Sequence, residues 1–374
     1  MKRLAFLGLA ALALAAPAAW SQNVPMDQPL EAEEPVLYKQ AFDRGIDFNQ
    51  RVGALATRHG FRGELGMAAP GTQVYGAQPA LPGGSYRPGL WRWASVTKQI
   101  TAILIMQEVA AGRITLDQPV ARYLPRFASP GARQITVRQL LRHQSGLPNT
   151  DRADGAYHRP VFAGSRSALT GYCAGPLTAP PGGSWSYNNC DYIVAGALLQ
   201  SVTGKPWAQL VRERISVPLA LKSVGTFPTR LQTVPGFDRG QPEPNFDLAS
   251  YGASGALYGS INDLLTLDMA LLSGGLLPQA QLDEMWDGQA DLGFVALGQW
   301  SFAVPLKGCA TPVRIVERRG AIGGVQVRNF ILPEQQTAVV AFTDRGEFEF
   351  GEVWQGSGFA HDLLSLAACR QEEP

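Results

Sequence analysis

The chain contains the stretch Trp93-Ala94-Ser95-Val96-Thr97-Lys98-Gln99, which continues into an apolar run over residues 100–111. If Ser95 opens a helix, Lys98 follows one turn later on the same face, within reach of the Ser95 hydroxyl. Apolar residues cover more than one stripe of this helix. We therefore predict that it runs through a core and ends at Gly112.

Ser95 and Lys98 have the spacing of a nucleophile and its base. A serine hydroxyl attacks a carbonyl only when a nearby group takes its proton. A lysine can take that proton as the neutral amine, which burial or a neighbouring cation favours. The Ser-x-x-Lys spacing also occurs by chance in chains of this length, so the interpretation needs partner groups elsewhere.

The N-terminus has the pattern of a secretory signal peptide, which we place at residues 1–21. A basic start, Met1-Lys2-Arg3, precedes an apolar run with small residues at its end. A membrane helix is the alternative, but the run is short, rich in alanine and interrupted by Pro17. We expect a periplasmic or secreted protein, with residues 22–374 as the mature chain and no transmembrane helix within them.

Export would permit disulfide bonds. The four cysteines are Cys173, Cys190, Cys309 and Cys369. Of the three possible pairings we favour Cys173 with Cys190 and Cys309 with Cys369, because the first two bracket one loop rich in glycine and proline. Four buried thiols are the alternative.

Composition argues against several classes of function. The formal net charge is +1, with interspersed signs and no basic footprint for nucleic acid. The four histidines are scattered, and neither C-x-x-C nor H-E-x-x-H occurs. We expect no metal, no cofactor and no nucleic-acid partner. We also expect a monomer that acts on a small-molecule or peptide substrate.

Hydrophobic periodicity predicts strands at both ends of the chain and helices between them. The predicted strands are 61–68, 72–77, 298–304, 313–317, 325–332 and 337–342. The predicted helices outside the Ser95 stretch are 36–58, 136–142, 192–203 and 358–368. One sheet built from distant halves, about 36–115 and 290–374, with a mainly helical insertion at about 116–289, makes an α+β fold. The long connection 145–188 indicates a functional loop or a surface excursion.

Tyr187-Asn188-Asn189 is the one Tyr-x-Asn motif of the chain. A tyrosine beside a lysine ammonium loses its proton more readily, so Tyr187 could serve as base and acid. The amide of Asn189 offers both a donor and an acceptor to a substrate amide. The alternative is an ordinary turn, since such segments often flank glycine and proline.

A third candidate group is ERRGAIGG at residues 317–324, placed at the end of one predicted strand and before another. Its glycines permit a ligand to approach backbone N–H groups closely. An arginine at such an edge can hold a carboxylate with two hydrogen bonds. A charged hairpin rim is the alternative.

Taken together, these segments resemble the serine β-lactamase-related hydrolases, and more narrowly the branch of class C β-lactamases, D,D-carboxypeptidases and esterases. The similarity covers nearly the whole mature chain. The segments that carry it are SVTK (95–98), ITLDQPVARYLP (114–125), ITVRQLLRHQSGLP (135–148), Pro181-Gly182, Tyr187-Asn188-Asn189 and GSINDL (259–264). The resemblance implies an antiparallel sheet flanked by helices, joined to a mainly helical region, with the site between them.

The resemblance also implies roles for single residues. It makes Ser95 the nucleophile, Lys98 its lysine partner and Tyr187 the acid and base. Asn189 becomes a polar contact to the substrate. Backbone N–H groups of Ser95 and, with the third motif aligned on Gly320, of Ala321 would form the oxyanion hole.

The third motif departs from the family pattern of Lys or His, a variable residue and Gly. This chain has Arg318-Arg319-Gly320. Arginine keeps the positive charge but cannot act as a base. A role in binding an anionic substrate remains open, and we expect Arg318 rather than Arg319 to face the site.

We therefore predict an exported serine hydrolase that forms an acyl-enzyme on an ester or amide. A peptidoglycan-derived D,D-peptide, a short-chain ester and a β-lactam all remain open as substrates. The alternative is a non-catalytic or weakly acylating binding protein with the same fold, in which the arginine has removed turnover.

Overall fold

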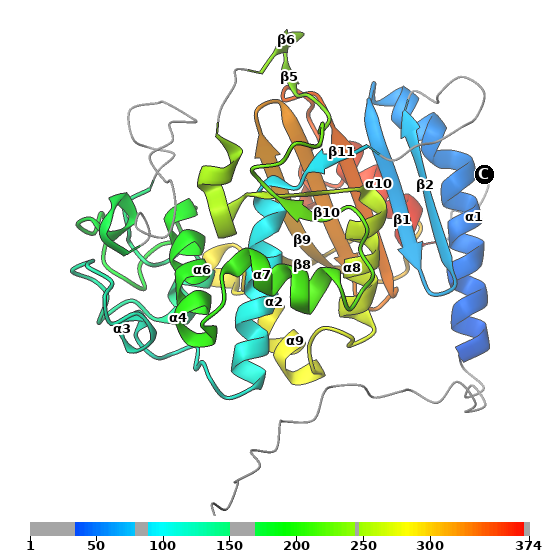
Figure 1. Cartoon of the computed structure of the whole chain (residues 1–374). Coiled ribbons are helices and arrows are strands. Elements are labelled where there is room, and N and C mark those ends of the chain that lie inside the picture. The colour runs from blue at the N-terminus through cyan, green and yellow to red at the C-terminus, as the bar shows by residue number, and fades with distance from the viewer. Residues whose placement is uncertain (1–33, 79–88, 150–168, 244–246, 370–374) are drawn as a thin grey trace, which may run out of the picture.

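The computed structural model of the protein describes residues 34–78, 89–149, 169–243 and 247–369 (Figure 1). The expected signal peptide at 1–21 and part of the long connection 145–188 lie outside these residues. Among the helices of the described segments, none combines the length and the apolar character needed to cross a bilayer.

One antiparallel sheet of six strands forms the centre of the fold (Figure 1), in the order β2-β1-β11-β10-β9-β8. The strands are β1 (Gly63–Ala69), β2 (Thr72–Gln78), β8 (Trp300–Val304), β9 (Val313–Ile322), β10 (Val325–Leu332) and β11 (Thr337–Thr343). Strands β1 and β11 pair with Glu64 opposite Phe342, so the two ends of the chain meet in the middle of the sheet. This confirms the predicted α+β fold with a sheet built from distant halves.

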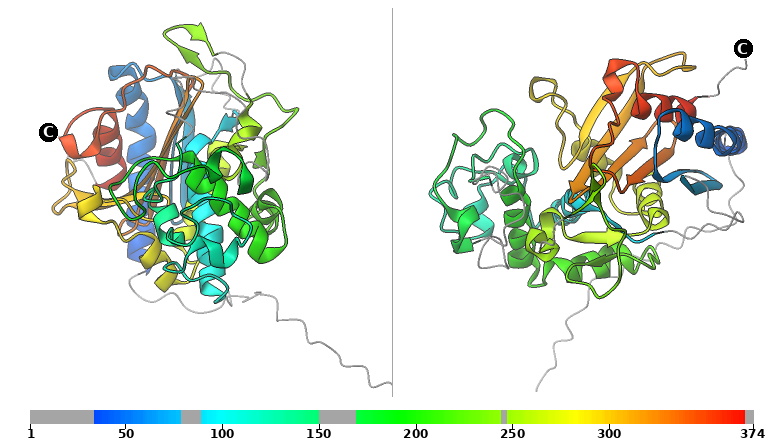
Figure 2. Two further views of the ribbon diagram at one scale, coloured as in Figure 1. Left: turned by 90° about the vertical axis from the view of Figure 1, so that its left-hand side faces the viewer. Right: turned by 90° about the horizontal axis from the view of Figure 1, so that it is seen from above.

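Helices cover both faces of the sheet. Helices α1 (Glu34–Arg58) and α10 (Phe359–Ala368) lie together on one face, and α2 (Thr97–Ala110) and α8 (Ile261–Leu272) lie on the other (Figure 2). Successive residues of β11 alternate between the two cores: Val339 packs on the α1 side and Val340 on the α2 side. The whole of β11 is buried, as expected for a strand between two helical layers.

The middle of the chain is mainly helical, as predicted, but it also contains short strands. Its helices are α3 (Val120–Tyr123), α4 (Val137–Leu141), α6 (Asn189–Thr203), α7 (Trp207–Val211) and α9 (Gln279–Met285). Its strands are β4 (Gly225–Thr226), β5 (Phe237–Asp238), β6 (Gln241–Pro242) and β7 (Leu257–Gly259), with β3 (Trp91–Arg92) pairing on β7. Strands of two or three residues show no alternation, so periodicity could not predict them.

Several single-turn elements complete the description. The 3₁₀ segments are η2 (Ala94–Val96), η4 (Tyr172–Ala174), η6 (Leu248–Ser254), η7 (Ala290–Leu292) and η8 (Val353–Gln355), and a π-helical turn η5 (Arg212–Ser216) follows α7.

The start of the central helix corrects the prediction for Ser95. Ser95 lies in the 3₁₀ turn η2, and α2 begins only at Thr97. The backbone of Ala94 has φ +44°, so the chain turns sharply just before Ser95. From Thr97 to Met106 every residue of α2 is buried, which confirms a helix that runs through a core. The helix ends at Ala110, ahead of Gly112 with φ +69°.

Two further boundaries differ from the prediction. Helix α6 starts at Asn189 rather than at 192, because the Asn188 side chain caps it by accepting a hydrogen bond from the Cys190 N–H at 2.9 Å. Strand β9 continues to Ile322 instead of ending at 317. The ERRGAIGG segment therefore lies mostly within a strand, and only Gly323-Gly324 forms the turn.

A buried polar cluster ties α2 and α8 to the sheet. Gln99 of α2 and Asn329 of β10 donate hydrogen bonds to Oδ1 of Asp268 in α8, at 2.8 and 3.2 Å. Burial raises the pKa of Asp268 to about 7, and the two hydrogen bonds offset only part of this effect. The folded protein therefore holds a proton on this carboxyl group up to near neutral pH.

This proton makes stability depend on pH. The pKa of Asp268 is higher in the folded chain than the ordinary value of 3.8. Its contribution is therefore complete below pH 4 and is lost as the pH rises through about 7, by on the order of 3 kcal/mol. We expect urea unfolding between pH 4.5 and 8 to show a decline in the wild type that is smaller by on the order of 3 kcal/mol in Asp268→Asn. The exposed Asp291→Asn is the control. Parallel curves for wild type and Asp268→Asn would contradict the assignment.

Candidate active site

The predicted groups meet at one cavity of about 990 Å³, lined by Ser95, Tyr187, Asn189, Arg318 and the 320–321 segment. Ser95 comes from η2, the tyrosine motif from the loop before α6, and the arginine from β9. The site thus lies where the edge of the sheet meets the helical region. Residues separated by more than 200 positions in the sequence are brought together here.

Lys98 is the centre of the hydrogen-bond network in the site. Its side chain is fully buried, and its Nζ donates to Ser95 Oγ at 3.1 Å and to the Tyr187 hydroxyl at 2.6 Å. It also donates to Asn189 Oδ1 at 2.6 Å and to the backbone carbonyl of Ser254 at 2.8 Å. Four fixed acceptors hold the amine in one place, one helical turn from the Ser95 hydroxyl.

The hydroxyl groups of Ser95 and Tyr187 are also hydrogen-bonded to each other. The Ser95 oxygen therefore contacts both an amine and a phenol. Such a triangle can carry a proton away from a serine that attacks a carbonyl and return it to a leaving group. This is the chemistry that the sequence predicted for these residue types.

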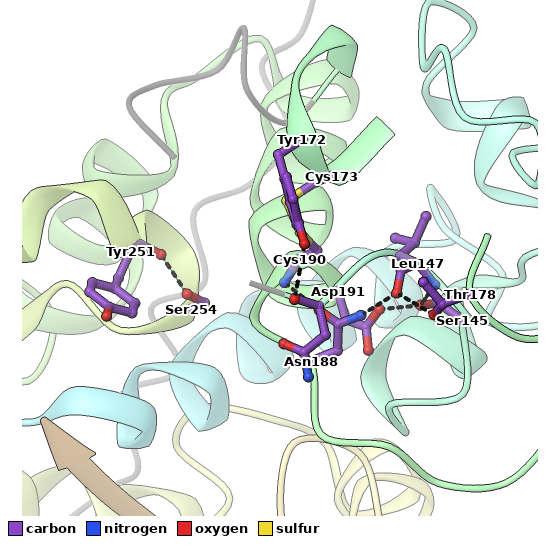
Figure 3. The surroundings of a disulfide bond; sticks show 11 residues. Ser145, Leu147, Tyr172, Cys173, Thr178, Asn188, Cys190, Asp191, Tyr251 and Ser254 are labelled. Atoms are coloured by element: carbon purple, nitrogen blue, oxygen red, sulfur yellow. Dashed lines mark hydrogen bonds between the residues drawn. A yellow bond between two sulfur atoms is a disulfide. The ribbon is translucent and has the colours of Figure 1, made fainter. Parts of the chain in front are cut away.

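Two disulfides are present, and they have the favoured pairing. Cys173 is bonded to Cys190, and Cys309 to Cys369. The first joins η4 to the start of α6, three residues after Tyr187 (Figure 3). It therefore anchors the segment that carries the tyrosine motif.

Strand β9 presents a backbone edge to the cavity. Gly323 and Gly324, with φ of +53° and +77°, form a two-residue turn in which the flanking residues Ile322 and Val325 pair. Alternate residues of β9 then bond to β10, so the N–H of Ala321 points to the other edge. Strand β8 pairs only as far as Glu317 and leaves the edge at Ala321 uncovered.

Gly320 allows this edge to approach the nucleophile. A Cβ atom at Gly320 would lie 2.7 Å from the Trp93 carbonyl oxygen and 3.1 Å from the backbone N of Ser95. Both distances are shorter than ordinary contacts of a Cβ atom, so a side chain at this position would clash and only glycine fits. The N–H groups of Ser95 and Ala321 therefore belong to neighbouring backbone segments at one end of the cavity.

Arg318 and Arg319 point to opposite faces of β9, because side chains alternate along a strand. Arg318 is only 2% exposed, and its Nε donates to the carbonyl of Ser95 at 2.8 Å. Its guanidinium lies 5.4 Å from the ring centre of Trp300. Arg319 instead forms ion pairs with Glu317 and Glu352 on the other face. Both arginines border the cavity, and Arg318 is the one that contacts Ser95.

One nitrogen of Arg318 lacks a hydrogen-bond partner within the described part of the chain. Its Nη2 atom is buried and makes no hydrogen bond to any of the described residues. A buried guanidinium nitrogen without an acceptor is costly. Arg318 borders the cavity, and its positive charge can attract an anionic group there.

Sequence reasoning missed the Ser254 carbonyl, which accepts from Lys98, and the ring of Trp300. A backbone carbonyl leaves no side-chain signal, and nothing in the sequence around Trp300 distinguishes it from a core aromatic residue. Within the described segments, no group of three or more His, Cys, Asp or Glu side chains could hold a metal ion.

Comparison with known proteins gives a consistent result. The family model described as Beta-lactamase matches residues 71–355. Esterase EstB of Burkholderia gladioli is 30% identical over 311 residues, which is 70% of this chain and 76% of that protein. The D-alanyl-D-alanine-carboxypeptidase/endopeptidase AmpH of Escherichia coli K12 is 28% identical over 296 residues, 71% of this chain and 74% of its own.

Solved structures show the same fold. A D-stereospecific amidohydrolase from Streptomyces sp. has a TM-score of 0.67 at 26% identity and covers 80% of this chain and 94% of its own. The D-amino acid amidase of Ochrobactrum anthropi SV3, complexed with D-phenylalanine, has a TM-score of 0.68 at 22% identity. It covers 87% of this chain and 99% of its own.

Proposed function

The chain belongs to the beta-lactamase family, and we propose that it is an exported serine hydrolase that works through a covalent acyl-enzyme. The single observation that carries the proposal is the hydrogen-bonded triangle of Ser95, Lys98 and Tyr187 at the wall of the cavity. Relatives that are named as an esterase and as a carboxypeptidase support the reaction class.

In the acylation step, Ser95 Oγ attacks the carbonyl carbon of an ester or amide. Tyr187, assisted by Lys98, takes the serine proton and then gives it to the departing alcohol or amine. The bond between the carbonyl carbon and the leaving group breaks as the ester to Ser95 forms. Asn189 keeps Lys98 in place and offers its amide to the substrate.

The negative charge that develops on the carbonyl oxygen needs donors that are already in position. We assign this role to the N–H groups of Ser95 and Ala321, at the edge that Gly320 brings close to η2. Each such donor contributes on the order of 3 kcal/mol to transition-state stabilisation. In the deacylation step, water attacks the carbonyl carbon of the acyl-enzyme and gives its proton to Tyr187. The ester bond to Ser95 breaks, the proton returns to Ser95 Oγ, and the acid is released.

We also propose that residues 1–21 direct export and that residues 22–374 form the mature hydrolase domain. The basic and apolar N-terminal pattern supports this proposal. The two disulfides support it as well, because such bonds persist in the periplasm or outside the cell rather than in a reducing cytosol.

For the substrate, the positive charge of Arg318 beside the cavity favours a molecule with a carboxylate next to the bond that is cleaved. A D-alanyl-D-alanine peptide has this arrangement, and the AmpH relative is named for that specificity. The structural neighbour named as a D-stereospecific amidohydrolase supports the same stereochemical class. A neutral short-chain ester is the second candidate, which the relative EstB favours.

A pair of matched peptides tests the arginine. We compare an acylated D-Ala-D-Ala peptide with the same peptide ending in a carboxamide. Replacing Arg318 by Met should lower kcat/KM for the acid by 10- to 100-fold more than for the amide, since charge-assisted hydrogen bonds are worth about 1.5–3 kcal/mol.

Arg126→Met is the control for this experiment, because Arg126 is exposed and does not line the cavity. It should change the acid and the amide by the same factor, at a temperature where all variants remain folded. An equal loss for both peptides in Arg318→Met would show that Arg318 acts only through Ser95 and does not bind the carboxylate.

A panel of substrates tests the function itself. The mature protein is assayed for turnover of an activated short-chain ester, a D-amino acid amide, the D-Ala-D-Ala peptide and a penicillin. We expect turnover of at least one of these and its loss in Ser95→Ala. Saturable binding without turnover of any of them would identify a non-catalytic binding protein instead.

A further inference from the structure

Two buried side chains that take no part in the proposed reaction steps pack against the Tyr187-Asn188-Asn189 segment. His143 follows α4 and is 3% exposed, and Asp191 lies in the first turn of α6 and is fully buried. His143 Nδ1 lies 3.0 Å from Asp191 Oδ2. Neither residue lines the cavity, so neither contacts a substrate.

Both side chains connect to the segment that carries Tyr187. The N–H of Asn188 donates to His143 Nδ1 at 3.2 Å. The hydroxyl of Ser145 donates to Asp191 Oδ1, and the Asn188 side chain donates to the Leu147 carbonyl at 2.9 Å (Figure 3). The residue next to Tyr187 is thus held at its backbone and at its side chain.

The ring of His143 also packs directly on the catalytic phenol. The ring centres of His143 and Tyr187 are 4.8 Å apart with an angle of 49° between the planes. His143 has φ +58°, a conformation that few residues other than glycine adopt readily. The strained backbone at His143 places its imidazole ring against the Tyr187 ring.

The hydrogen bonds assign the proton of the pair. Because the backbone N–H of Asn188 can only donate, His143 Nδ1 must accept. In this tautomer Asp191 Oδ2, at 3.0 Å from the same nitrogen, donates a proton of its own, and the Nε2–H of His143 is buried without a partner among the described residues. Burial raises the pKa of Asp191 well above its ordinary value and lowers that of His143, which agrees with a neutral carboxyl beside a neutral imidazole.

We propose that His143 and Asp191 are positioning residues for the reaction, in which the protonated Asp191 carboxyl fixes the His143 ring and the ring fixes the Tyr187 phenol against Ser95 and Lys98. The inference rests on the proposed function, since it concerns the geometry of the same catalytic triangle. It adds two residues that lie behind the triangle.

Positively charged side chains lie near the pair of His143 and Asp191. Lys98 of α2 acts on both members and Arg318 of β9 acts on His143, and the phenols of Tyr187 and Tyr192 pack around the imidazole. Lys98 favours ionisation of Asp191, but desolvation outweighs it and raises the pKa of this carboxyl group.

Variants at Asp191 separate positioning from general stability. In the full mature chain, Asp191→Leu removes the donor to His143 and should lower kcat for an activated ester by 10- to 100-fold, with KM within about threefold of wild type. Asp191→Asn keeps a donor and an acceptor in the same places. It should restore kcat to within about threefold of wild type and leave the pH profile of kcat unchanged.

Variants at His143 provide a second comparison if Asp191→Leu does not fold. Asparagine and glycine both tolerate the φ of +58° that residue 143 adopts, so neither substitution strains the backbone. Only His143→Asn keeps an acceptor for the Asn188 N–H, so it should retain more kcat than His143→Gly at equal KM. Equal kcat values for these two variants would contradict the proposal.

Three results at Asp191 would overturn the inference: unchanged kcat in a folded Asp191→Leu, a loss confined to KM, or a shifted pH profile in Asp191→Asn. The wild-type assay separates this failure from failure of the proposed function. If wild type turns over no substrate, the function is wrong. If wild type is active and Asp191→Leu is equally active, only the positioning role is wrong.

Discussion

Replacing Ser95 by Ala should lower kcat by on the order of 10⁴- to 10⁶-fold, because Ser95 is the only serine, threonine or cysteine among the described residues that line the cavity. Within the described segments, the hydroxyl is hydrogen-bonded to the side chains of Lys98 and Tyr187. Its loss removes no packing, so the variant should fold and unfold at nearly the same temperature as wild type. Steady-state hydrolysis of an activated ester and thermal unfolding provide the two measurements.

Ser184→Ala is the control for this experiment, since Ser184 is an exposed serine close to the tyrosine motif. It should retain wild-type kcat. A Ser95→Ala variant with more than about a tenth of wild-type kcat would place the nucleophile elsewhere, as would an equal loss in the two variants.

Replacing Lys98 by Met should have the second largest effect. Methionine has similar length and fills the same space, but it donates no proton to the Ser95 and Tyr187 hydroxyls. Loss of general-base assistance costs about 10²- to 10⁴-fold in rate, and we expect kcat to fall by this factor.

The same change should also lower stability. The buried acceptors Asn189 Oδ1 and the Ser254 carbonyl lose their donor, which costs on the order of 1–3 kcal/mol. Lys205→Met, at an exposed lysine, is the control and should change neither kcat nor the urea midpoint. Wild-type kcat in a folded Lys98→Met variant would exclude Lys98 from the proton transfer.

Much of the fold could be predicted because its main elements are long and periodic. Strand β10 begins with an alternating pattern, β11 is a continuous apolar run, and α1 repeats with helical spacing, so each was found within one or two residues. The boundary at Ser95 was wrong for a local reason. The positive φ of Ala94 inserts a 3₁₀ turn that no sequence pattern reports.

The candidate site could be predicted in part. Ser95, Lys98 and Tyr187 carry recognisable chemistry at recognisable spacings, and the structure brings them together. The positions of Arg318 and of the Ala321 N–H depend on the register of β9, which the sequence alone did not determine because the glycines suggested a loop. His143 remained a scattered histidine until its distance to Asp191 was known.

The most direct measurement is the intact mass of the mature protein and of Ser95→Ala after a brief incubation with an acylating substrate and quenching in acid. A slowly hydrolysed activated ester and a penicillin serve as separate probes, and peptide mapping locates any adduct. We expect wild type to gain one acyl group on the peptide that contains Ser95, and Ser95→Ala to gain none. An adduct that persists in Ser95→Ala, or one that maps to another residue, would contradict the account.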